Sequence, residues 1–208
     1  MAIQDILPDP YHTITPAGEE GGIAGPGFAS VKISSDQPIM RDRTNSGRLI
    51  SRTAAYHKWS IDIGYNPMTK TEFDPVYTFL LHKQGTLKPF FISLPQYRVQ
   101  NIANKTFTAS AVAGATTISC NTTDIVVGAL FRINDSQDSS HTKAYMVTRV
   151  GTSSITILPG LAKAVTGGAV IQFVDPTIKV IQTSDVQEYS LGTNNLYSFS
   201  LKLEEVSQ

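Results

Sequence analysis

Cysteine, charge and long apolar runs are all scarce in this sequence of 208 residues. With Cys120 as its single cysteine, the chain has no intrachain disulfide and no cysteine-rich metal site. No apolar run reaches the length of a transmembrane helix, and the first residues lack the basic and apolar regions of a signal peptide. We therefore expect a protein that is made in a cytoplasm, has no membrane anchor and stays soluble until it assembles or acts.

The balance of charge argues against a polyanion as the main partner. The 17 basic residues equal the 17 acidic ones, whereas proteins that bind nucleic acids depend on a basic excess. Charged residues make up only 16% of the chain, and the cores of protein interfaces are depleted in charge. The composition favours a chain that packs against other chains and predicts no sequence-specific binding of nucleic acid.

Motifs of catalysis are also missing. There is no glycine-rich phosphate loop, no histidine pair at metal-binding spacing and no serine elbow. Cys120 and His141 would make a nucleophile and a base, but Cys120 lies in an alternating strand pattern and is interpreted as a small buried side chain. Residues 134–138 resemble a loose calcium loop without its glycine and distal glutamate, so they are interpreted as a turn. We predict that the chain is no enzyme and has no catalytic residue, cofactor or metal site.

The densest apolar stretch runs from Trp59 to Tyr97. Apolar and polar residues alternate over 59–65, which is the period of a strand with one buried face. A helix over about 72–83 follows, because Thr69 and Glu72 have the spacing of a capping box and Gly85 is placed to end the helix. Residues 89–94 predict a second buried strand. This unit has too much apolar surface for itself and needs another layer to cover it.

A change of character divides the rest of the chain. From 106 to 175 aromatic residues thin out, and short alternating stretches between turn signals predict a small antiparallel barrel of five or six strands. After Pro176 the composition again resembles that of the first hundred residues, and the alternating strand over 197–204 is expected to cover the face of Trp59. We predict a mainly β fold with one helix. Residues 1–103 and 176–208 form a discontinuous β-sandwich, and residues 104–175 form the inserted barrel.

Two features near the N-terminus predict contacts with neighbours. Residues 1–27 are rich in proline and glycine and indicate an irregular arm, which is either a frayed end or a segment that orders on another chain. Residues 39–43 and 48–53 flank a good turn and predict a hairpin with one aspartate, Asp42. Its charges either protect a solvated edge or contact an acidic surface on a neighbouring subunit. The basic residues of this hairpin are Arg41, Arg43, Arg48 and Arg52.

The barrel leaves a second function open. Barrels of this kind bind oligonucleotides or sugars through basic and aromatic residues on one face. Here the aromatic residues are few, and at least Phe131 and Phe173 lie in core-like alternation; the set is Phe107, Phe131, Tyr145 and Phe173. A nucleic-acid role is weakly supported, whereas a carbohydrate-binding role stays open because it needs little charge.

Several motifs occur together in a characteristic order. They are the strand that starts at Trp59, the Pro-Met-Thr segment at 67–69 before the helix, and the phenylalanine-rich strand between Gly85 and Pro95. The stretches 113–118, 128–133 and 157–161 add to them. In these features most of the chain resembles the distal tail protein (Dit) family of long-tailed, siphovirus-type bacteriophages. The motifs that carry the resemblance are structural rather than catalytic.

This resemblance implies a structural virion protein of the phage tail tip. Such a protein forms a hexameric ring that joins the tail tube to the distal tip or baseplate complex and leaves a lumen for DNA ejection. The sandwich would build the ring, and the inserted barrel would be OB-like and project outward. The implied partners are further copies of the chain, the tail tube protein and the hub proteins of the tip or baseplate.

The alternative function is a carbohydrate-binding module that uses the inserted barrel for attachment to the host surface. The long carbohydrate-binding insertion of some relatives is missing from this chain. For the ring contacts we select the hairpin residues Arg41, Arg43, Arg48 and Arg52 with the N-terminal arm, and expect the helix to support them. A closed ring leaves no heterologous face of any subunit uncovered.

Overall fold

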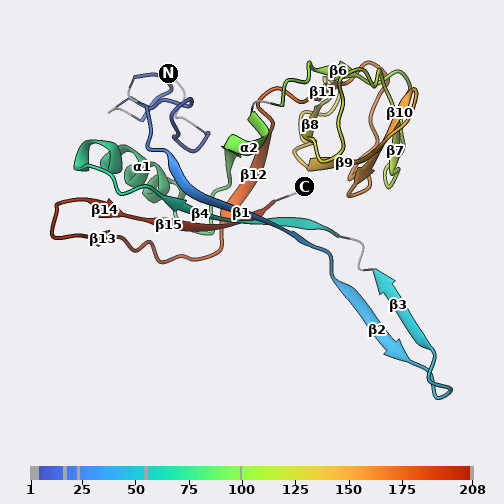
Figure 1. Ribbon diagram of the computed structural model, residues 1–208, viewed down its shortest axis with the longest axis horizontal. Coiled ribbons are helices and arrows are strands. Elements are labelled where there is room, and N and C mark those ends of the chain that lie inside the picture. Colours follow the sequence, from blue (N-terminus) through green and yellow to red (C-terminus); the bar gives the residue numbers. More distant parts are fainter. Residues whose placement is uncertain (1–4, 16–17, 23, 54–55, 99, 207–208) are drawn as a thin grey trace.

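The computed structural model is a mainly β protein built on two large sheets (Figure 1). It describes residues 5–15, 18–22, 24–53, 56–98 and 100–206. The predicted mainly β class is confirmed, and a short second helix, α2 (Pro95–Arg98), accompanies the expected one, α1 (Lys70–Lys83). Part of the arm expected over 1–27 (residues 1–4, 16–17 and 23) lies outside the described residues. Neither described helix has the length and apolar character needed to cross a membrane.

A five-stranded antiparallel sheet forms the body of the molecule. Its strands stand in the order β1-β4-β15-β12-β5. Their bounds are Phe28–Asp36 (β1), Lys58–Tyr65 (β4), Ser200–Glu205 (β15), Thr177–Gln182 (β12) and Phe90–Ser93 (β5). Three of these strands come before residue 94 and two come after residue 176. The sheet is therefore assembled from both ends of the chain.

Alternation along β4 decides which face of this sheet is buried. The four apolar side chains at positions 59, 61, 63 and 65 are buried, whereas Asp62 between them is exposed. α1 packs in the same apolar cluster. The buried apolar residues of the helix are Phe73, Val76, Phe79 and Leu80. β15 was expected to cover the face of Trp59, but it pairs beside β4 in the same sheet, with Leu203 opposite Ile61. Alternation shows which face of a strand is apolar and does not show the layer in which the strand lies.

The N-terminal end of α1 follows the predicted capping spacing. The carboxylate of Glu72 accepts hydrogen bonds from the backbone N–H of Thr69 at 2.9 Å and from its hydroxyl at 2.8 Å. At the other end Gln84, and not Gly85, is the capping residue, with a left-handed φ of 56° and an N–H that donates to the Leu81 carbonyl. Gly85 follows with a φ of 61°, one position beyond the observed cap.

The second sheet lies in the middle of the chain and has six antiparallel strands. Their order is β6-β11-β8-β9-β10-β7. Their bounds are Lys105–Thr106 (β6), Thr117–Ser119 (β7), Leu130–Asn134 (β8), Ala144–Val150 (β9), Ser154–Leu158 (β10) and Val170–Gln172 (β11). The sheet curls around an apolar cluster of its own, which contains Phe131, Phe173 and Cys120. Cys120 is buried there, as predicted.

The sequence also predicts a strand over 106–112, one helical turn over 161–165 and a strand over 186–191, and these three local predictions were wrong. The strand expected over 106–112 is reduced to β6 and two isolated bridges at Phe107 and Ala111, and residues 161–165 form no helical turn. The strand expected over 186–191 is reduced to β13 (Ser190–Leu191), which pairs with β14 (Tyr197–Ser198). Each is a short segment, so neighbours in space decide its conformation.

The two sheets meet through a covalent and a non-covalent junction. Ser93 at the end of β5 lies opposite Thr177 at the start of β12, so the central unit enters and leaves the first sheet at adjacent positions. Across the junction, the indole N–H of Trp59 donates to the carbonyl of Ala144 at 3.1 Å. The barrel side of the molecule therefore covers the part of the β4 face that contains Trp59.

Candidate subunit interface

A two-stranded hairpin extends away from the body of the molecule (Figure 1). β2 (Ile39–Arg43) and β3 (Leu49–Thr53) pair with each other beyond the end of β1 and β4. In the turn, the N–H of Thr44 donates to the carbonyl of Arg48 at 3.0 Å, and Gly47 has a φ of 82°. The hairpin predicted from the sequence is confirmed, with β3 one residue shorter than expected.

The register of this hairpin divides the predicted arginines between two faces. Arg41 and Arg43 lie opposite residues 51 and 49, whereas Arg52 lies opposite Met40. Opposed residues of antiparallel strands share a face, and successive residues alternate between faces. Arg41 and Arg43 therefore share one face, and Arg52 and Arg48 belong to the other. The hairpin brings all four arginines together as one element but not as one flat patch.

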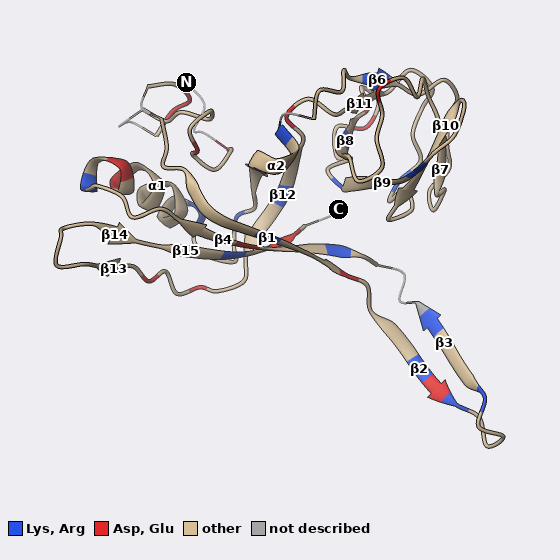
Figure 2. Ribbon diagram, in the orientation of Figure 1, with Lys and Arg blue, Asp and Glu red and all other residues tan. Residues whose placement is uncertain are grey.

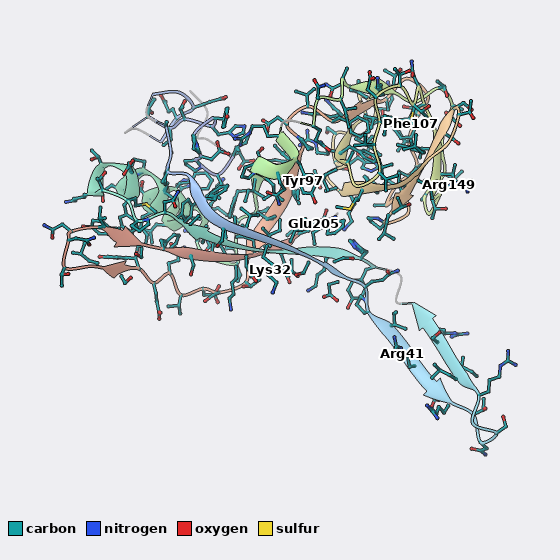
Figure 3. All side chains as sticks on the ribbon, in the orientation of Figure 1. Lys32, Arg41, Tyr97, Phe107, Arg149 and Glu205 are labelled. Atoms are coloured by element: carbon teal, nitrogen blue, oxygen red, sulfur yellow. The ribbon has the colours of Figure 1, made fainter. Side chains whose placement is uncertain are left out.

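The arginines of the hairpin have no acidic partner among the residues that the structure describes. Among the described residues none of the four forms an ion pair, and the Asp42 carboxylate instead accepts the backbone N–H of Arg43 at 2.7 Å. Blue segments on both strands in Figure 2 mark their basic residues, and Figure 3 shows Arg41 clear of the body of the molecule. A positive charge concentrated on a projecting element attracts an acidic surface from another molecule.

Apolar side chains on both faces of the hairpin are also uncovered. Met40 is 72% exposed, and the set of exposed large apolar residues here is Ile39, Met40, Leu49 and Ile50. A lone two-stranded hairpin is at best marginally stable in water, and its open edges invite pairing. This hairpin lacks a packing partner among the described residues of its own subunit. It is the element best suited to a subunit interface.

The described part of the N-terminal arm is ordered on its own subunit. The N–H of Leu7 donates to the carbonyl of Phe91, and the N–H of Phe91 donates to the carbonyl of Asp5, both at 2.8 Å. This pairing runs parallel to β5 and covers that edge of the sheet. The arm is thus neither frayed nor free over these residues, which the proline and glycine content did not predict.

A charged cluster that the sequence analysis missed ties this arm to the junction between the sheets. His12 lies 3.1 Å from Asp9 and 3.0 Å from Asp175, and the guanidinium of Arg98 in α2 bonds to both carboxylates, at 2.5 and 3.2 Å. The hydroxyl of Ser93 donates to Asp175. These residues lie up to 166 positions apart in the sequence, from Asp9 to Asp175, so no local spacing signals them.

Each group in this cluster holds its partners in the charged form. Hydrogen bonding to Asp175 and then to Asp9 raises the pKa of His12 from 6.5 to about 9. The hydrogen bond from His12 is the main cause that lowers the pKa of Asp175. Burial alone would raise the pKa of Asp9, but hydrogen bonds from His12 and Tyr11 outweigh it and lower that pKa. The cluster is saturated with internal partners, so it acts as a structural clasp.

Other predicted candidates lie elsewhere. α1 covers the end of the sheet that is opposite the hairpin, so the expectation that it supports the arginines within one subunit was wrong (Figure 1). His141 contacts the hydroxyl of Tyr145 at 2.7 Å and not the thiol of Cys120. Burial raises the pKa of Cys120, which makes it a poor nucleophile.

Comparison with known proteins addresses the same region. Residues 7–97 match the family model described as the N-terminal part of the A domain of distal tail protein pb9. The chain is also 26% identical over 212 residues to distal tail protein pb9 of Escherichia phage T5, an alignment that covers 96% of this chain and 98% of that protein. The chain is therefore similar, over nearly its whole length, to a phage distal tail protein. The similarity supports a structural role in a phage tail.

The range of the family model includes the hairpin. Residues 39–53 lie within the matched range of 7–97, whereas the six-stranded sheet follows it. The hairpin and the strands β1, β4 and β5 therefore belong to the part of the chain that the family model describes.

Proposed function

We propose that this chain acts as a phage distal tail protein and forms a closed ring of six copies that joins the tail tube to the distal tip or baseplate complex. The observation that carries the proposal is the projecting hairpin, whose apolar and basic side chains find no partner among the described residues of their own subunit. A subunit that extends one uncovered element toward a neighbour uses a heterologous contact, and a ring is the arrangement in which such contacts close.

We assign a separate role in the ring to the part of the chain around each of the two apolar clusters. One cluster is centred on the five-stranded sheet and α1, and the other is enclosed by the six-stranded sheet. We assign ring formation to a discontinuous domain of residues 1–103 and 176–208. The inserted, OB-like barrel of residues 104–175 projects from the ring toward the tail's other components.

The uncovered face of the five-stranded sheet suits a lumen through which DNA passes. Neighbouring strands there place Lys32, Asp62 and Lys202 in one row, and the same face carries several serines, Gly64, Lys179 and the ion-paired Lys58, Asp36 and Glu204. Alternating charges and small polar groups neither attract DNA strongly nor bind its bases. A face of this kind lets a polyanion pass without holding it.

The proposed role is architectural rather than catalytic. The two residues that offered a nucleophile and a base are buried in different contacts, and no group of three or more potential metal ligands gathers among the described residues. The partners under this proposal are further copies of the chain, the tail tube protein and the hub proteins of the tip.

The carbohydrate-binding alternative receives less support from the barrel. Stacking on sugars or bases requires exposed aromatic faces, and all four aromatic residues of the barrel are buried: Phe107, Phe131, Tyr145 and Phe173. Figure 3 shows Phe107 inside the barrel. A glycan array probed with the full-length protein separates the two functions, because reproducible sugar binding would favour the alternative.

Charge reversal on one face of the hairpin tests the ring. The double variant Arg41→Glu/Arg43→Glu should fold as the wild type but fail to form rings, since both positions are exposed and unpaired in the described part of the subunit. Light scattering gives the mass of the assembly, and negative-stain images of tail particles show whether a ring of about six copies is present.

A matched control separates the hairpin from a general effect of charge. Arg149→Glu reverses an exposed arginine on β9 of the barrel and should leave assembly unchanged. If the double hairpin variant assembles as well as Arg149→Glu, the hairpin is not the ring contact and the proposal fails.

A further inference from the structure

A groove opens where two strands of the five-stranded sheet separate. β12 pairs with β15 as far as Gln182, and one further hydrogen bond joins the N–H of Thr183 to the carbonyl of Lys202 at 3.1 Å. The chain then leaves β15 and returns only at β13, which pairs with β14. Residues 183–189 form one wall of the groove, and residues 199–202 form the other.

Three residues that line this groove each carry a buried side-chain polar atom without a hydrogen-bond partner among the described residues. These atoms are the amide nitrogen of Gln182, the hydroxyl oxygen of Tyr65 and the amide oxygen of Gln187, and both Gln182 and Tyr65 are more than nine-tenths buried. A buried donor without a partner is costly, so such groups usually bond to something that binds there. The groove is therefore incomplete in the isolated subunit.

The rim of the groove is both apolar and acidic. Val186 is 66% exposed, and Tyr189 and Leu191 on the same segment are exposed as well. The segment 183–191 carries Asp185 and Glu188 and no basic residue. Lys202 lies on the opposite wall of the groove, and Asp185 accepts hydrogen bonds from Thr86. Exposed apolar side chains on an acidic segment suit a partner that is both apolar and basic.

The hairpin of β2 and β3 has these complementary properties. It carries four arginines against one aspartate and exposes apolar residues on both of its faces. It lies at one end of the longest axis of the molecule, whereas β13 and β14 lie at the other end (Figure 1). The hairpin therefore cannot reach the groove of its own subunit, although it can reach that of a neighbour.

We propose that the hairpin of each subunit docks on the groove of the next copy of this chain. The proposal rests on the ring and names the acceptor surface of its contact. Each copy then donates one hairpin and receives one, so every uncovered apolar surface of this kind is covered when the ring closes. The arginines meet Glu188 and Asp185, and backbone or side-chain groups of the hairpin satisfy Gln182 and Tyr65.

Contact between two hairpins is the main competing arrangement. It would place four arginines of one copy against four of another, and like charges brought together at an interface disfavour the contact. It would also leave the groove open and its polar groups unsatisfied. The donor and acceptor surfaces at opposite ends favour the head-to-tail arrangement.

Disulfide cross-linking in tail particles distinguishes these arrangements. One chain would carry Met40→Cys on the hairpin and Val186→Cys at the groove, both highly exposed positions. The native Cys120 is buried and can stay. Under mild oxidation the monomer should be lost to a ladder of linked chains, whereas Met40→Cys or Val186→Cys alone should give no ladder. Pairing Ile50→Cys with Leu191→Cys repeats the test at a second contact.

The outcomes separate this proposal from the one on which it rests. Particles that contain the ring but give no ladder with either cysteine pair would overturn the docking and leave the ring intact. Dimers from Met40→Cys alone would show hairpin-to-hairpin contact and also overturn the docking. Particles that hold the chain without a ring would overturn both proposals.

A charge exchange gives an independent readout in the same particles. Glu188→Arg should reduce assembly, and combining it with Arg41→Glu and Arg43→Glu should restore assembly relative to either change alone. Asp124→Arg, on an exposed turn of the barrel, is the matched control and should neither disturb assembly nor rescue the hairpin variant. Rescue by Asp124→Arg equal to that by Glu188→Arg would contradict the assigned acceptor.

Discussion

Lys143 and Glu205 form a buried ion pair across the junction between the two sheets. The ammonium of Lys143 contacts one carboxylate oxygen of Glu205, and it also donates to the carbonyl of His57 at 2.6 Å. The second carboxylate oxygen accepts the N–H of Ala144 at 2.9 Å, and the first also accepts the N–H of Trp59 at 3.2 Å. Burial raises the pKa of Glu205, although Lys143 opposes this shift. The pair is saturated with hydrogen bonds, which is the condition under which a buried pair persists.

Removing one partner of this pair should destabilise the fold strongly. Lys143→Met leaves the Glu205 carboxylate buried without its counter-charge, and a loss of roughly 3–5 kcal/mol is expected. The double variant Lys143→Met/Glu205→Leu removes both charges and should recover a large part of that loss. Urea unfolding of the three proteins measures the difference. A single variant as stable as the wild type would show that the pair contributes nothing.

The clasp around His12 should make stability depend on pH in two windows. The folded pKa of His12 is raised from 6.5 to about 9, so its contribution is complete below pH 6.5 and is lost as pH rises through 9. The folded pKa of Asp175 is lowered from 3.8, so its contribution is present above that value and is lost as pH falls below it. The clasp therefore contributes most to the stability of the fold between pH 3.8 and pH 6.5.

The variant His12→Gln tests this dependence. It should remove on the order of 2 kcal/mol at pH 6 and much less at pH 9.5. Denaturant unfolding at both pH values gives the comparison, with His82→Gln on the exposed face of α1 as the control. A constant difference between His12→Gln and the wild type across this range would refute the assignment.

Trp59 should be among the most sensitive positions of the core. Truncation to alanine removes a buried ring and its hydrogen bond to Ala144, and should cost roughly 3–5 kcal/mol. Trp59→Phe keeps most of the packing but loses the indole donor, so about 1 kcal/mol is expected. Because Trp59 is the only tryptophan, circular dichroism rather than fluorescence should follow unfolding. Equal losses for the two variants would mean that the hydrogen bond, not the ring, accounts for the effect.

Cys120 should be inert in the folded protein. Its side chain is buried and its pKa is raised by burial, so the reactive thiolate is scarce and inaccessible. A thiol reagent should label it only after denaturant unfolds the barrel, at a rate that follows unfolding. Rapid labelling of the native protein would contradict the burial of this residue.

Local sequence patterns predicted the elements better than their arrangement. The sequence predicts strands over 144–150 and 154–158, and the structure has β9 and β10 at these residues. The capping spacing located the start of α1 because Thr69 and Glu72 interact within one turn. Such patterns depend only on residues that are close in the sequence, so they can be read without knowledge of the fold.

The hairpin of the candidate interface was predicted from the sequence, but the faces on which its arginines lie were not. Alternation would have shown that Arg41 and Arg43 share a face that Arg52 does not, once the turn was located. The groove, by contrast, depends on where β12 leaves β15, and these strands are separated by the loop of residues 183–199. No local pattern announces that separation. For the same reason the clasp and the Lys143–Glu205 pair could not be predicted from spacing.

The six-stranded sheet is inserted at a point where the strand order of the five-stranded sheet does not depend on it, although the stability of that sheet does. Because Ser93 and Thr177 are register partners, a short connection between them would leave every strand of the five-stranded sheet in place. The barrel is therefore a module that can be exchanged without rethreading the chain. Yet the same module shields Trp59 and supplies the counter-charge for Glu205. A different inserted unit would have to cover Trp59 and supply a counter-charge for Glu205. We therefore expect the residues at these two positions to change together with the inserted unit.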